Sequence, residues 1–404
     1  MNNIYPIVFL KKGKEESLLR FHPWVFSGAI SKISDGIVEG DVVEVRDSGG
    51  QFVAVGHYQI GSIAVRVLSF EQRHIDDSFW EERLKAALLL RRSVIGHVGN
   101  VMKDNKETTT FRLVHGEGDL LPGLVVDIYG KTAVMQAHSV GMHCCRDSIA
   151  HALVKVLKGV VNNVFYKSET TLPYKAELGQ QDGFLVGDST DNVAVENGLR
   201  FHIDWLKGQK TGFFIDQRDN RSLLEQYSDG RSVLNMFCYT GGFSVYALRG
   251  GAKVVHSVDS SAKAIELTRQ NVALNFPEDH RHEAFCEDAF RFLDGISSQT
   301  NYDLIVLDPP AFAKHRGAIH NALKGYIRLN QKAFEKIPSG GILFTFSCSQ
   351  AITKDYFRNA VFTAAALARR NVRILHQLHQ PADHPVNIFH PEGEYLKGLV
   401  MYVE

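Results

Sequence analysis

The sequence of 404 residues has no net charge, because 45 lysines and arginines balance 45 aspartates and glutamates. It therefore lacks an overall positive field that would hold a polyanion, and a nucleic-acid partner must be held by a local basic patch. Long apolar runs are also missing, since none approaches the roughly 18 residues that are needed to cross a bilayer. These absences predict a protein with no membrane partner and a cytoplasmic location.

Cysteine is scarce, and its pattern excludes two common uses. The chain has five cysteines, an odd number without any Cys-x-x-Cys pair, which argues against a disulfide framework and against a zinc ribbon. We expect free thiols in a reducing compartment. Four of the five are expected to be small buried hydrophobic side chains, namely Cys144, Cys145, Cys238 and Cys286.

A metal site and a signal peptide are not expected either. The spacing of four histidines near the C-terminus fits no standard ligand set, so we expect them on strand surfaces. They are His376, His379, His384 and His390. Residues 4–10 are apolar but come before their basic neighbours, which is the wrong order for a signal peptide.

Length and pattern together predict three domains. Residues 1–74 hold short β-branched segments between glycine-rich turns, which is typical of a small β-barrel or sandwich. Residues 75–190 mix helical and strand patterns, which indicates an α+β domain. Residues 191–404 repeat strand, glycine turn and helix, which predicts an α/β domain with a Rossmann-like, doubly wound parallel sheet.

The alternation of apolar residues and the positions of turns predict the individual elements. The expected strands are 4–10, 42–46, 52–58, 63–68, 111–115, 123–129, 132–137, 163–167, 232–237, 253–258, 302–307, 341–345, 372–379 and 395–402. The expected helices are 79–97, 142–157, 243–249, 262–275, 320–336 and 354–370.

Strand ends carry the information about function in such a sheet, because ligands bind beyond the carboxyl ends of the strands. The first strand leads into Gly241 and Gly242, which lack the three-glycine spacing of a dinucleotide fingerprint and also suit a simple tight turn. Asp259 ends the second strand at 259 minus 241, or 18, residues beyond the turn, which suits an acid that binds ribose hydroxyls. Asp288 follows the third strand and is a candidate for the adenine amino group. A helix N-cap is the alternative for both acids.

The strand at 302–307 ends in a stiff acidic loop. Asp308 is followed by Pro309 and Pro310, which forbid further helix or strand and hold the carboxylate in one place. Phe312 offers an aromatic face beside it, and a rigid acid next to a stacking surface suits a planar heterocycle. Stiffening of the loop without any chemistry is the alternative.

The next strand, 341–345, is followed by a thiol in polar surroundings. Cys348 lies between two serines, at the same edge of the predicted sheet as Asp308. A single cysteine is usually a buried hydrophobic residue. Its position and its polar neighbours nevertheless predict a catalytic role for Cys348.

Taken together, these motifs closely resemble the three-domain S-adenosylmethionine-dependent methyltransferases that form 5-methylcytosine in 23S ribosomal RNA. The resemblance runs over nearly the whole chain and implies a PUA-like domain, a central α+β domain and a Rossmann-like class I methyltransferase domain. The similar segments are His22-Pro23-Trp24-Val25-Phe26-Ser27-Gly28, residues 112–127 and 208–218, the glycine turn, Asp259, Asp308-Pro309-Pro310, Ser347-Cys348-Ser349 and Ala382-Asp383-His384-Pro385.

The resemblance implies that S-adenosylmethionine is the cofactor. It places residues 210–218 at the methionine end of the cofactor, Asp259 at the ribose and Asp288 near the adenine. The predicted cofactor-binding residues are Lys210, Thr211, Phe213, Phe214, Asp216, Arg218, Phe237, Tyr239, Gly241, Gly242, Asp259, Ser260, Asp288, Ala289, Asp308 and Pro309.

The reaction that the resemblance implies is methylation of cytosine at carbon 5. This carbon is too weak a nucleophile to attack a sulfonium methyl group unaided, so a thiol must first add to carbon 6. We assign the addition to Cys348, and to Asp308 a hydrogen bond or proton for ring nitrogen 3. Many RNA 5-methylcytosine enzymes carry a second cysteine in the motif that contains Asp308, but prolines stand here, so product release must proceed without a helper thiol.

The implied partner is 23S ribosomal RNA, either naked or in an assembly intermediate, and the sequence is compatible with a homodimer. Pro310 and Phe312 are the expected contacts of the target base, and Tyr239 is a second stacking candidate, although core packing is the alternative for both aromatic residues. The expected phosphate contacts, for which solvated surface is the alternative, are Lys11, Lys12 and Arg20, together with Lys14 and His22.

Two other functions fit the same residues. The Asp308 motif also resembles the Asp-Pro-Pro-aromatic motif of enzymes that methylate the amino group of adenine or guanine, a reaction that needs no thiol. A non-catalytic RNA-binding or ribosome-assembly protein that keeps the fold is the second. A nicotinamide enzyme is disfavoured because the three-glycine fingerprint is missing.

Overall fold

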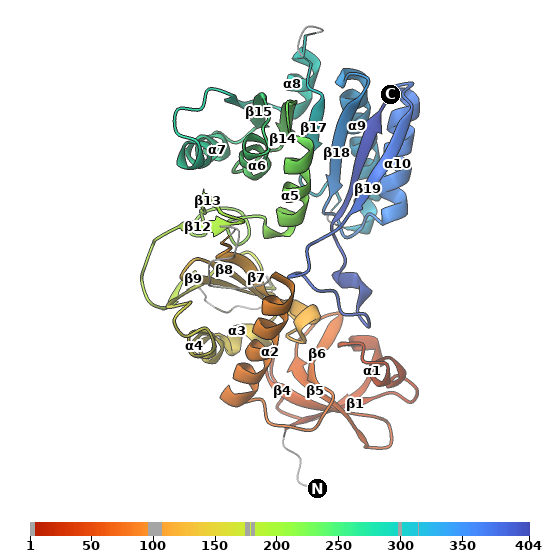
Figure 1. The fold of residues 1–404 in the computed structure, drawn as a ribbon. Coiled ribbons are helices and arrows are strands. Elements are labelled where there is room, and N and C mark those ends of the chain that lie inside the picture. Colours follow the sequence, from red (N-terminus) through yellow and green to blue (C-terminus); the bar gives the residue numbers. More distant parts are fainter. Residues whose placement is uncertain (1–4, 96–106, 174–177, 179–181, 298–300, 314) are drawn as a thin grey trace. The chain divides into compact units, whose positions relative to one another are not determined.

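The computed structural model of the chain describes residues 5–95, 107–173, 178, 182–297, 301–313 and 315–404. The chain divides into two compact units, coloured along the sequence in Figure 1. Unit 1 comprises Met1–Gly198, Ile203–Ile215 and Ala382–Gly393, and unit 2 comprises Leu199–His202, Asp216–Pro381 and Glu394–Glu404. Unit 1 contains two separate sheets, and the domain boundaries at 74 and 190 stay predictions.

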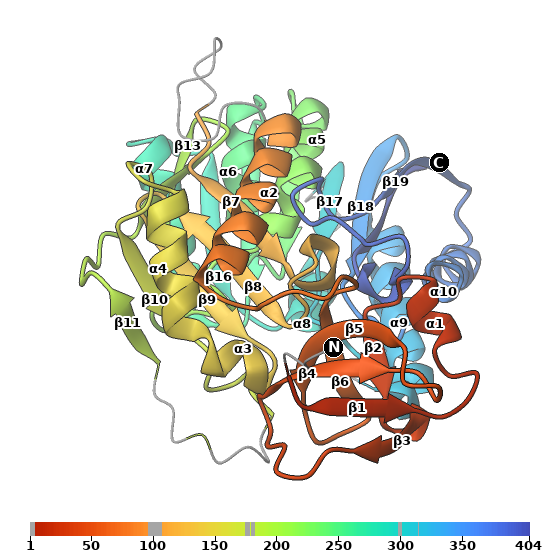
Figure 2. The same ribbon diagram turned by 90° about the horizontal axis from the view of Figure 1, so that it is seen from below.

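The first sheet of unit 1 has six strands in the order β2-β6-β5-β4-β1-β3 (Figure 2). Neighbouring strands are antiparallel except β1 and β4, which are parallel. Val8, Val43 and Val65 are fully buried on its inner face, as expected for β-branched residues on a half-buried sheet. The elements are β1 (Ile7–Leu10), α1 (Glu16–Leu19), β2 (Trp24–Phe26), β3 (Ile30–Ile33), β4 (Val42–Arg46), β5 (Phe52–Tyr58) and β6 (Ile63–Ser69).

The second sheet of unit 1 has five strands in the order β11-β10-β9-β8-β7. Helix α2 packs against α4 and β7, and its aromatic residues Phe79 and Trp80 are buried in the core between them. The elements are α2 (Asp77–Ile95), β7 (Thr110–His115), β8 (Leu124–Tyr129), β9 (Thr132–Ala137), α3 (Val140–Cys144), α4 (Arg146–Val156), β10 (Asn163–Tyr166), β11 (Gly183–Val186) and β12 (Val193–Glu196).

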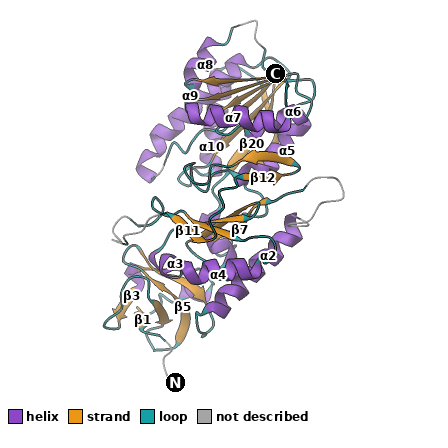
Figure 3. Ribbon diagram, turned by 90° about the vertical axis from the view of Figure 1, so that its left-hand side faces the viewer, coloured by secondary structure: helices purple, strands orange, loops and turns teal. Residues whose placement is uncertain are grey.

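Unit 2 is built on a seven-stranded sheet in the order β16-β15-β14-β17-β18-β20-β19. Figure 3 shows the strands of this unit in orange with its helices in purple. The first five strands are parallel, and β20 is antiparallel to both of its neighbours. The carboxyl ends of the five parallel strands therefore share one edge. The strands of this sheet are β14 (Ser232–Met236), β15 (Val254–Asp259), β16 (His282–Cys286), β17 (Leu304–Leu307), β18 (Gly341–Ser347), β19 (Val372–Leu378) and β20 (Lys397–Val403). Strand β13 (Leu199–His202) lies outside this sheet.

Helices cover both faces of the sheet in unit 2. Every residue of β17 and β18 is buried, which is typical of parallel strands between two layers of helices. Helix α6 packs against α5 and α7, whereas α9 packs against α8 and α10. The helices are α5 (Arg218–Tyr227), α6 (Gly242–Arg249), α7 (Ala262–Asn275), α8 (Ala289–Gly295), α9 (Ile319–Lys336) and α10 (Lys354–Leu367).

This architecture confirms the predicted α/β sheet, and most predicted elements differ only at their ends. The expected helix 142–157 is wrong, because the chain forms α3 and α4 with a break at Cys145. Helix α5 was missed because three of its four buried residues, Arg218, Asn220 and Arg221, are polar or charged, so its inner face is not marked by a stripe of apolar residues. Among the described residues no helix is long and apolar enough to span a membrane.

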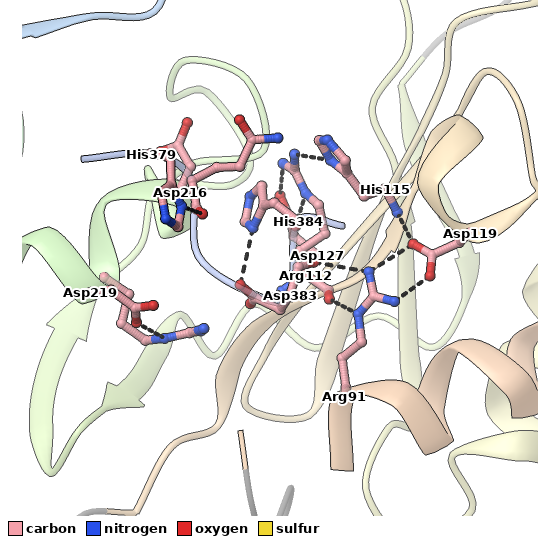
Figure 4. A network of polar contacts seen from close by, with 12 residues as sticks. Arg91, Arg112, His115, Asp119, Asp127, Asp216, Asp219, His379, Asp383 and His384 are labelled. Atoms are coloured by element: carbon pink, nitrogen blue, oxygen red, sulfur yellow. Dashed lines mark hydrogen bonds and ion pairs between the residues drawn. The ribbon is translucent and has the colours of Figure 1, made fainter. Parts of the chain in front are cut away.

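A buried ionic network holds the C-terminal segment 382–393 within unit 1 (Figure 4). The guanidinium of Arg91 is fully buried, binds both carboxylate oxygens of Asp119, and donates to the backbone carbonyls of Arg112 and Asp383 at 2.8 and 2.9 Å. The Asp383 carboxylate accepts the backbone N–H of Arg112 at 3.0 Å. This network explains why an aspartate stands in the motif at 382–385.

Two of the C-terminal histidines correct the interpretation of this region. His384 and His390 are only 2% and 3% exposed in unit 1, so their placement on strand surfaces is wrong. They lie beyond β19 in the segment 382–393, where His384 contacts the carboxylate of Asp383 through Nδ1. His376 does lie on β19, and its Nε2 contacts the hydroxyl of Tyr227 at 2.8 Å.

Removal of the Arg91 charge should destabilise unit 1. We expect Arg91→Met to lower the free energy of unfolding by about 3 to 5 kcal/mol, because the carboxylate of Asp119 would stay buried without its partner. All three tryptophans lie in unit 1, so urea unfolding followed by tryptophan fluorescence reports on this unit. Arg92→Met, at an exposed neighbouring position, is the control and should change stability by less than about 0.5 kcal/mol. Equal effects of the two substitutions would refute the structural role of the network.

Candidate active site

The turn after β14 is strained. Phe237, Tyr239 and Gly241 all have positive φ angles, of 57°, 49° and 78°. Such angles are costly for residues with a side chain and concentrate at functional sites. The backbone N–H of Tyr239 donates to Asp259 Oδ2 at 3.0 Å, so the ends of β14 and β15 are joined.

The two glycines of this turn are required by close packing. A Cβ atom on Gly241 would lie 2.6 Å from Cγ2 of Thr268, and one on Gly242 would lie 3.0 Å from Cδ of Arg221. The positive φ angle of Gly241 adds a second reason for glycine there. Packing and backbone conformation thus explain Gly241, whereas Gly242 is tightly packed against the Arg221 side chain. The contact of both glycines with a cofactor stays a prediction.

The two candidate cofactor acids differ in what their carboxylates do. Helix α7 is capped by Ser261, whose hydroxyl accepts from the N–H of Ala264, so Asp259 is not the N-cap. Among the described residues, Asp259 accepts the backbone N–H groups of Tyr239 and Ser261, and a carboxylate with about four acceptor positions keeps capacity for ribose hydroxyls. Asp288 does cap a helix, since its Oδ1 accepts from two N–H groups at the start of α8.

Asp308 lies directly after β17 and is a candidate acid at neutral pH. Burial of its carboxyl and the neighbouring charge of Asp216 raise the pKa of this group from 3.8 to about 7. A hydrogen bond from Gln217 and the charge of Arg221 oppose this rise. A carboxyl with such a pKa is partly protonated near pH 7 and can donate a proton or a hydrogen bond.

Asp216 carries a buried acceptor that awaits a donor. Its Oδ2 accepts from the hydroxyl of Tyr395 at 2.6 Å. Its Oδ1 is also buried, yet among the described residues no group donates to it. Burial of an unpaired carboxylate oxygen is costly, and such an oxygen near Asp308 suits a cationic ligand such as an ammonium group.

Cys348 is the first residue after β18, and its side chain is half-buried. The residue before it is fixed, because Ser347 Oγ donates to the hydroxyl of Tyr326 at 2.8 Å. The residue after it is fixed as well, because Ser349 Oγ donates to the carbonyl of Ala313, in the loop that Asp308 begins. The half-buried thiol is therefore carried by a loop that is braced on both sides of it.

Tyr326, on α9, joins the two loops. Besides the contact with Ser347, its hydroxyl accepts the backbone N–H of Phe312. Burial is the main reason that the pKa of the Tyr326 phenol rises to about 12. The electrostatic influence of Cys348 and Asp308 raises it as well. Tyr326 thus lies within electrostatic range of the acid and of the thiol.

The burial of the other four cysteines differs from the expectation. Cys238 is buried in a small core cluster with Ile265 and Ala284, as predicted. Cys144 and Cys286 are exposed and Cys145 is half-buried, so the prediction of burial is wrong for these three. A single small residue carries no periodicity of its own, and its burial depends on the neighbours that the fold supplies.

Four of the predicted cofactor-binding residues belong to unit 1. Lys210, Thr211, Phe213 and Phe214 belong to unit 1, where the hydroxyl of Thr211 is buried and donates to Asp127. Their role at the cofactor stays a prediction. The exposed residues of the predicted set are Lys11, Lys12, Arg20, Lys210, Ser260, Asp288 and Pro310; the half-buried ones are Phe214, Asp216, Phe237, Tyr239, Asp259, Asp308 and Phe312; and the buried ones are Thr211, Phe213, Arg218, Gly241, Gly242, Ala289 and Pro309.

The aromatic candidate Phe312 packs against the protein itself. Its ring lies 4.7 Å from that of Tyr326, and it borders the core of unit 2. Phe312 is therefore partly a core residue, which was the alternative to base stacking. Stacking on a base stays a prediction.

The predicted basic patch is partly brought together in unit 1. A hollow on the first sheet is lined by Lys11 and Lys12, with Lys32 from the adjacent strand β3. Lys32 pairs with Phe9 across β1 and β3, a register that the sequence alone does not reveal. Arg20 does not line this hollow.

Several site residues were missed by the sequence analysis. Gln217 and Arg221 act on Asp308, whereas Tyr326, Tyr395 and Lys397 contact the strand-end loops or Asp216. Gln217 lies in the segment 208–218, so that motif is the one signal that points to it. The others come from distant helices and strands without a local pattern.

Comparison with known proteins decides the family. A family model for S-adenosylmethionine-dependent methyltransferases matches residues 180–391, and one for PUA-like domains matches residues 8–70. The chain belongs to the S-adenosylmethionine-dependent methyltransferases. This confirms the predicted enzyme class, cofactor and fold.

Relatives in this family match the chain over almost its whole length. Proteins named ribosomal RNA large subunit methyltransferase I from Tolumonas auensis and Aeromonas hydrophila are 39% and 38% identical over 400 residues, which is 98% of each chain. A methyltransferase from Streptococcus mutans has the same fold, with a TM-score of 0.81 and 21% identity over 98% of this chain and 99% of its own. A methyltransferase solved with SAH has a TM-score of 0.82 at 21% identity, over the same shares of the two chains.

Unit 2 of this methyltransferase has groups that fit the cofactor. The buried Oδ1 of Asp216 suits the ammonium group of the methionine part. The free acceptor capacity of Asp259 suits ribose hydroxyls, because the two N–H groups that it accepts leave about two acceptor positions. The donor set is therefore chemically suited to S-adenosylmethionine.

The raised pKa of Asp308 predicts how stability depends on pH. A carboxyl whose pKa rises from 3.8 to about 7 on folding contributes stability below pH 4 and loses it as the pH rises to 7. We expect wild type to lose about 2 to 3 kcal/mol relative to Asp308→Asn between pH 5 and pH 8.

Urea unfolding followed by the reactivity of the buried thiol of Cys238 measures this in unit 2. Asp355→Asn, at an exposed position in α10, is the control and should show no such pH-dependent difference. A constant difference between wild type and Asp308→Asn at both pH values would contradict the raised pKa.

Proposed function

We propose that this methyltransferase modifies carbon 5 of a cytosine in 23S ribosomal RNA through a covalent bond between Cys348 and the base. The observation that carries the proposal is the half-buried thiol on a braced loop, tied to the loop of a carboxyl with a pKa of about 7. The names of the relatives support a substrate in the RNA of the large ribosomal subunit.

The thiol of Cys348 begins the reaction. As a thiolate it adds to carbon 6 of cytosine, which forms a sulfur–carbon bond and moves the electron pair of the carbon 5–carbon 6 double bond toward carbon 5 and the ring. Carbon 5 thereby becomes an enamine-type nucleophile. When bound, S-adenosylmethionine would supply carbon 5 with an electrophilic methyl group on a sulfonium ion, whose sulfur would be left as a thioether.

Asp308 supports the addition from the neighbouring strand. Its partly neutral carboxyl donates a hydrogen bond or a proton to ring nitrogen 3, where negative charge collects as the thiolate adds. A base then removes the proton of carbon 5, the double bond re-forms, and the Cys348 thiolate leaves. Pro309 and Pro310 follow the acid, so release proceeds without a helper thiol in this motif.

Residues of unit 2 would hold the cofactor beside these groups. Asp259 would bind the ribose, Asp216 would bind the methionine ammonium group, and Asp288 would lie near the adenine. The joined ends of β14 and β15 support this arrangement, since Tyr239 and Asp259 are hydrogen bonded.

The RNA is held by separate contacts. Lys11 and Lys12, together with Lys32, bind phosphates at the hollow of the first sheet. The target base leaves its stack at a cost of a few kcal/mol, which is smallest in single strands, and meets Phe312 and Pro310. We therefore propose that the substrate is a cytosine in an RNA loop. The RNA is either naked or part of an assembly intermediate.

Replacement of the thiol should abolish methylation. We expect Cys348→Ser to reduce methyl transfer from tritiated cofactor to unmodified 23S RNA to the background level, because a hydroxyl is not a comparable nucleophile at neutral pH. Cys286→Ser, at an exposed cysteine of the same unit, is the matched control and should keep wild-type activity. Undiminished methylation by Cys348→Ser would rule out the covalent mechanism.

Nucleoside analysis of the methylated RNA distinguishes the competing functions. The proposed reaction gives 5-methylcytosine, whereas amino-group methylation gives a methylated adenine or guanine. Absence of cofactor binding in calorimetry would instead favour a non-catalytic RNA-binding protein. Deproteinised 23S RNA and isolated large-subunit particles, assayed side by side, distinguish the two substrate forms.

The lysine hollow should control the salt dependence of RNA binding. We expect each of Lys11→Gln, Lys12→Gln and Lys32→Gln to reduce the slope of log affinity against log salt concentration by about 0.7 to 0.9, because one phosphate contact is lost. Filter binding with 23S RNA fragments at several salt concentrations measures this slope. Lys158→Gln, exposed near the second sheet, should leave the slope unchanged. Equal slopes in all variants would place the phosphate contacts elsewhere.

A further inference from the structure

Lys397 is a buried cation beside the nucleophile loop, and the mechanism above does not use it. It is the first residue of β20 and lies directly opposite Ser347 in the antiparallel pair of β18 and β20. Side chains that face each other in this way have Cβ atoms about 5 Å apart. Cys348 is the next residue after Ser347, so the lysine is next to the loop that presents the thiol. Only 6% of Lys397 is exposed.

The ammonium group of Lys397 organises this loop. Its Nζ donates to the carbonyl of Ser349 at 2.6 Å and to the carbonyl of Ile352 at 2.7 Å. Both carbonyls lie just beyond Cys348 in the chain, so the loop bends around the cation. A buried charge is costly unless it is hydrogen bonded, and simple packing would favour an apolar residue here.

The charges around Lys397 point to the thiol. Burial lowers the pKa of the Lys397 ammonium from 10.5 to about 8, and the largest opposing influence is Cys348. Glu394 and Lys354 also act on it, but with opposite signs, and these two side chains form an ion pair of 2.5 Å with each other. On α9, the phenol of Tyr326 lies within electrostatic range of Cys348.

We propose that Lys397 is a positioning residue for the nucleophile: its ammonium group holds residues 348–352 in place and favours the thiolate form of Cys348. The proposal rests on the proposed function, in which this thiolate attacks cytosine. A free thiol with a pKa near 8.5 is only a few per cent ionised at pH 7, so a neighbouring cation makes more of the nucleophile available. Lys397 acts through Cys348 and needs no contact with the RNA.

The pH dependence of Cys348 alkylation tests the proposal without RNA or cofactor. Iodoacetamide reacts with thiolates, and mass spectrometry of the Cys348 peptide gives the rate at each pH. We expect Lys397→Gln, which keeps donors for the two carbonyls but removes the charge, to move the midpoint up by about one pH unit. Lys397→Arg, which keeps the charge, should stay near the wild-type midpoint.

Other cysteines of unit 2 serve as internal controls. The exposed Cys286 should keep one midpoint in all variants, and the buried Cys238 should stay unreactive wherever the unit is folded. If Lys397→Gln exposes Cys238, Lys397→Met replaces it, because an apolar side chain of similar length is tolerated at a buried site. An unchanged midpoint in the folded uncharged variant overturns the proposal and leaves Lys397 with a structural role alone.

The result is independent of the assignment of the reaction. Full activity of Cys348→Ser would remove the catalytic meaning of the thiolate even if the alkylation midpoint moved. An unchanged midpoint together with an inactive Cys348→Ser would instead keep the covalent mechanism and reject only the role of Lys397.

Discussion

The hydrogen bonds of the Tyr326 hydroxyl hold together the two loops on which the chemistry depends. This single group accepts from Ser347 beside the thiol and from the backbone of Phe312 in the loop of the acid. Parallel strands bring the carboxyl ends of β17 and β18 to the same edge, but they do not fix the direction of the loops beyond them. The tyrosine on α9, with the bond from Ser349 to Ala313, supplies that constraint and so determines how the acid and the thiol are presented.

Burial adjusts the acidity of the groups at this edge in complementary ways. It raises the pKa of Asp308, so that the carboxyl is partly neutral, and lowers that of Lys397, which stays largely protonated at neutral pH. The site thus combines a proton donor and a cation around a half-buried thiol. In a solvated setting the same carboxyl would be fully ionised and could not donate a proton to a ring nitrogen.

Unit 1 uses buried charge for a different purpose. Arg91 and Arg112 bind Asp119, Asp127 and Asp383 with well-formed hydrogen bonds, and this network includes a chain segment almost 300 residues away from Arg91 in sequence. A neutral chain therefore contains strongly charged interiors. The net charge of zero describes the field of the whole chain, but it does not show where the individual charges act.

The sequence by itself determined the class of fold, the family and the positions of Asp308 and Cys348, because strand ends in a parallel sheet are marked by local turns, prolines and glycines. It did not reveal α5, whose buried residues are mostly polar, nor the exposure of Cys144 and Cys286. The partners of the site residues, such as Tyr326, Tyr395 and Lys397, were decided only by the tertiary structure. They come from elements distant in sequence, and their contacts depend on strand register and helix packing, for which no local pattern of residues exists.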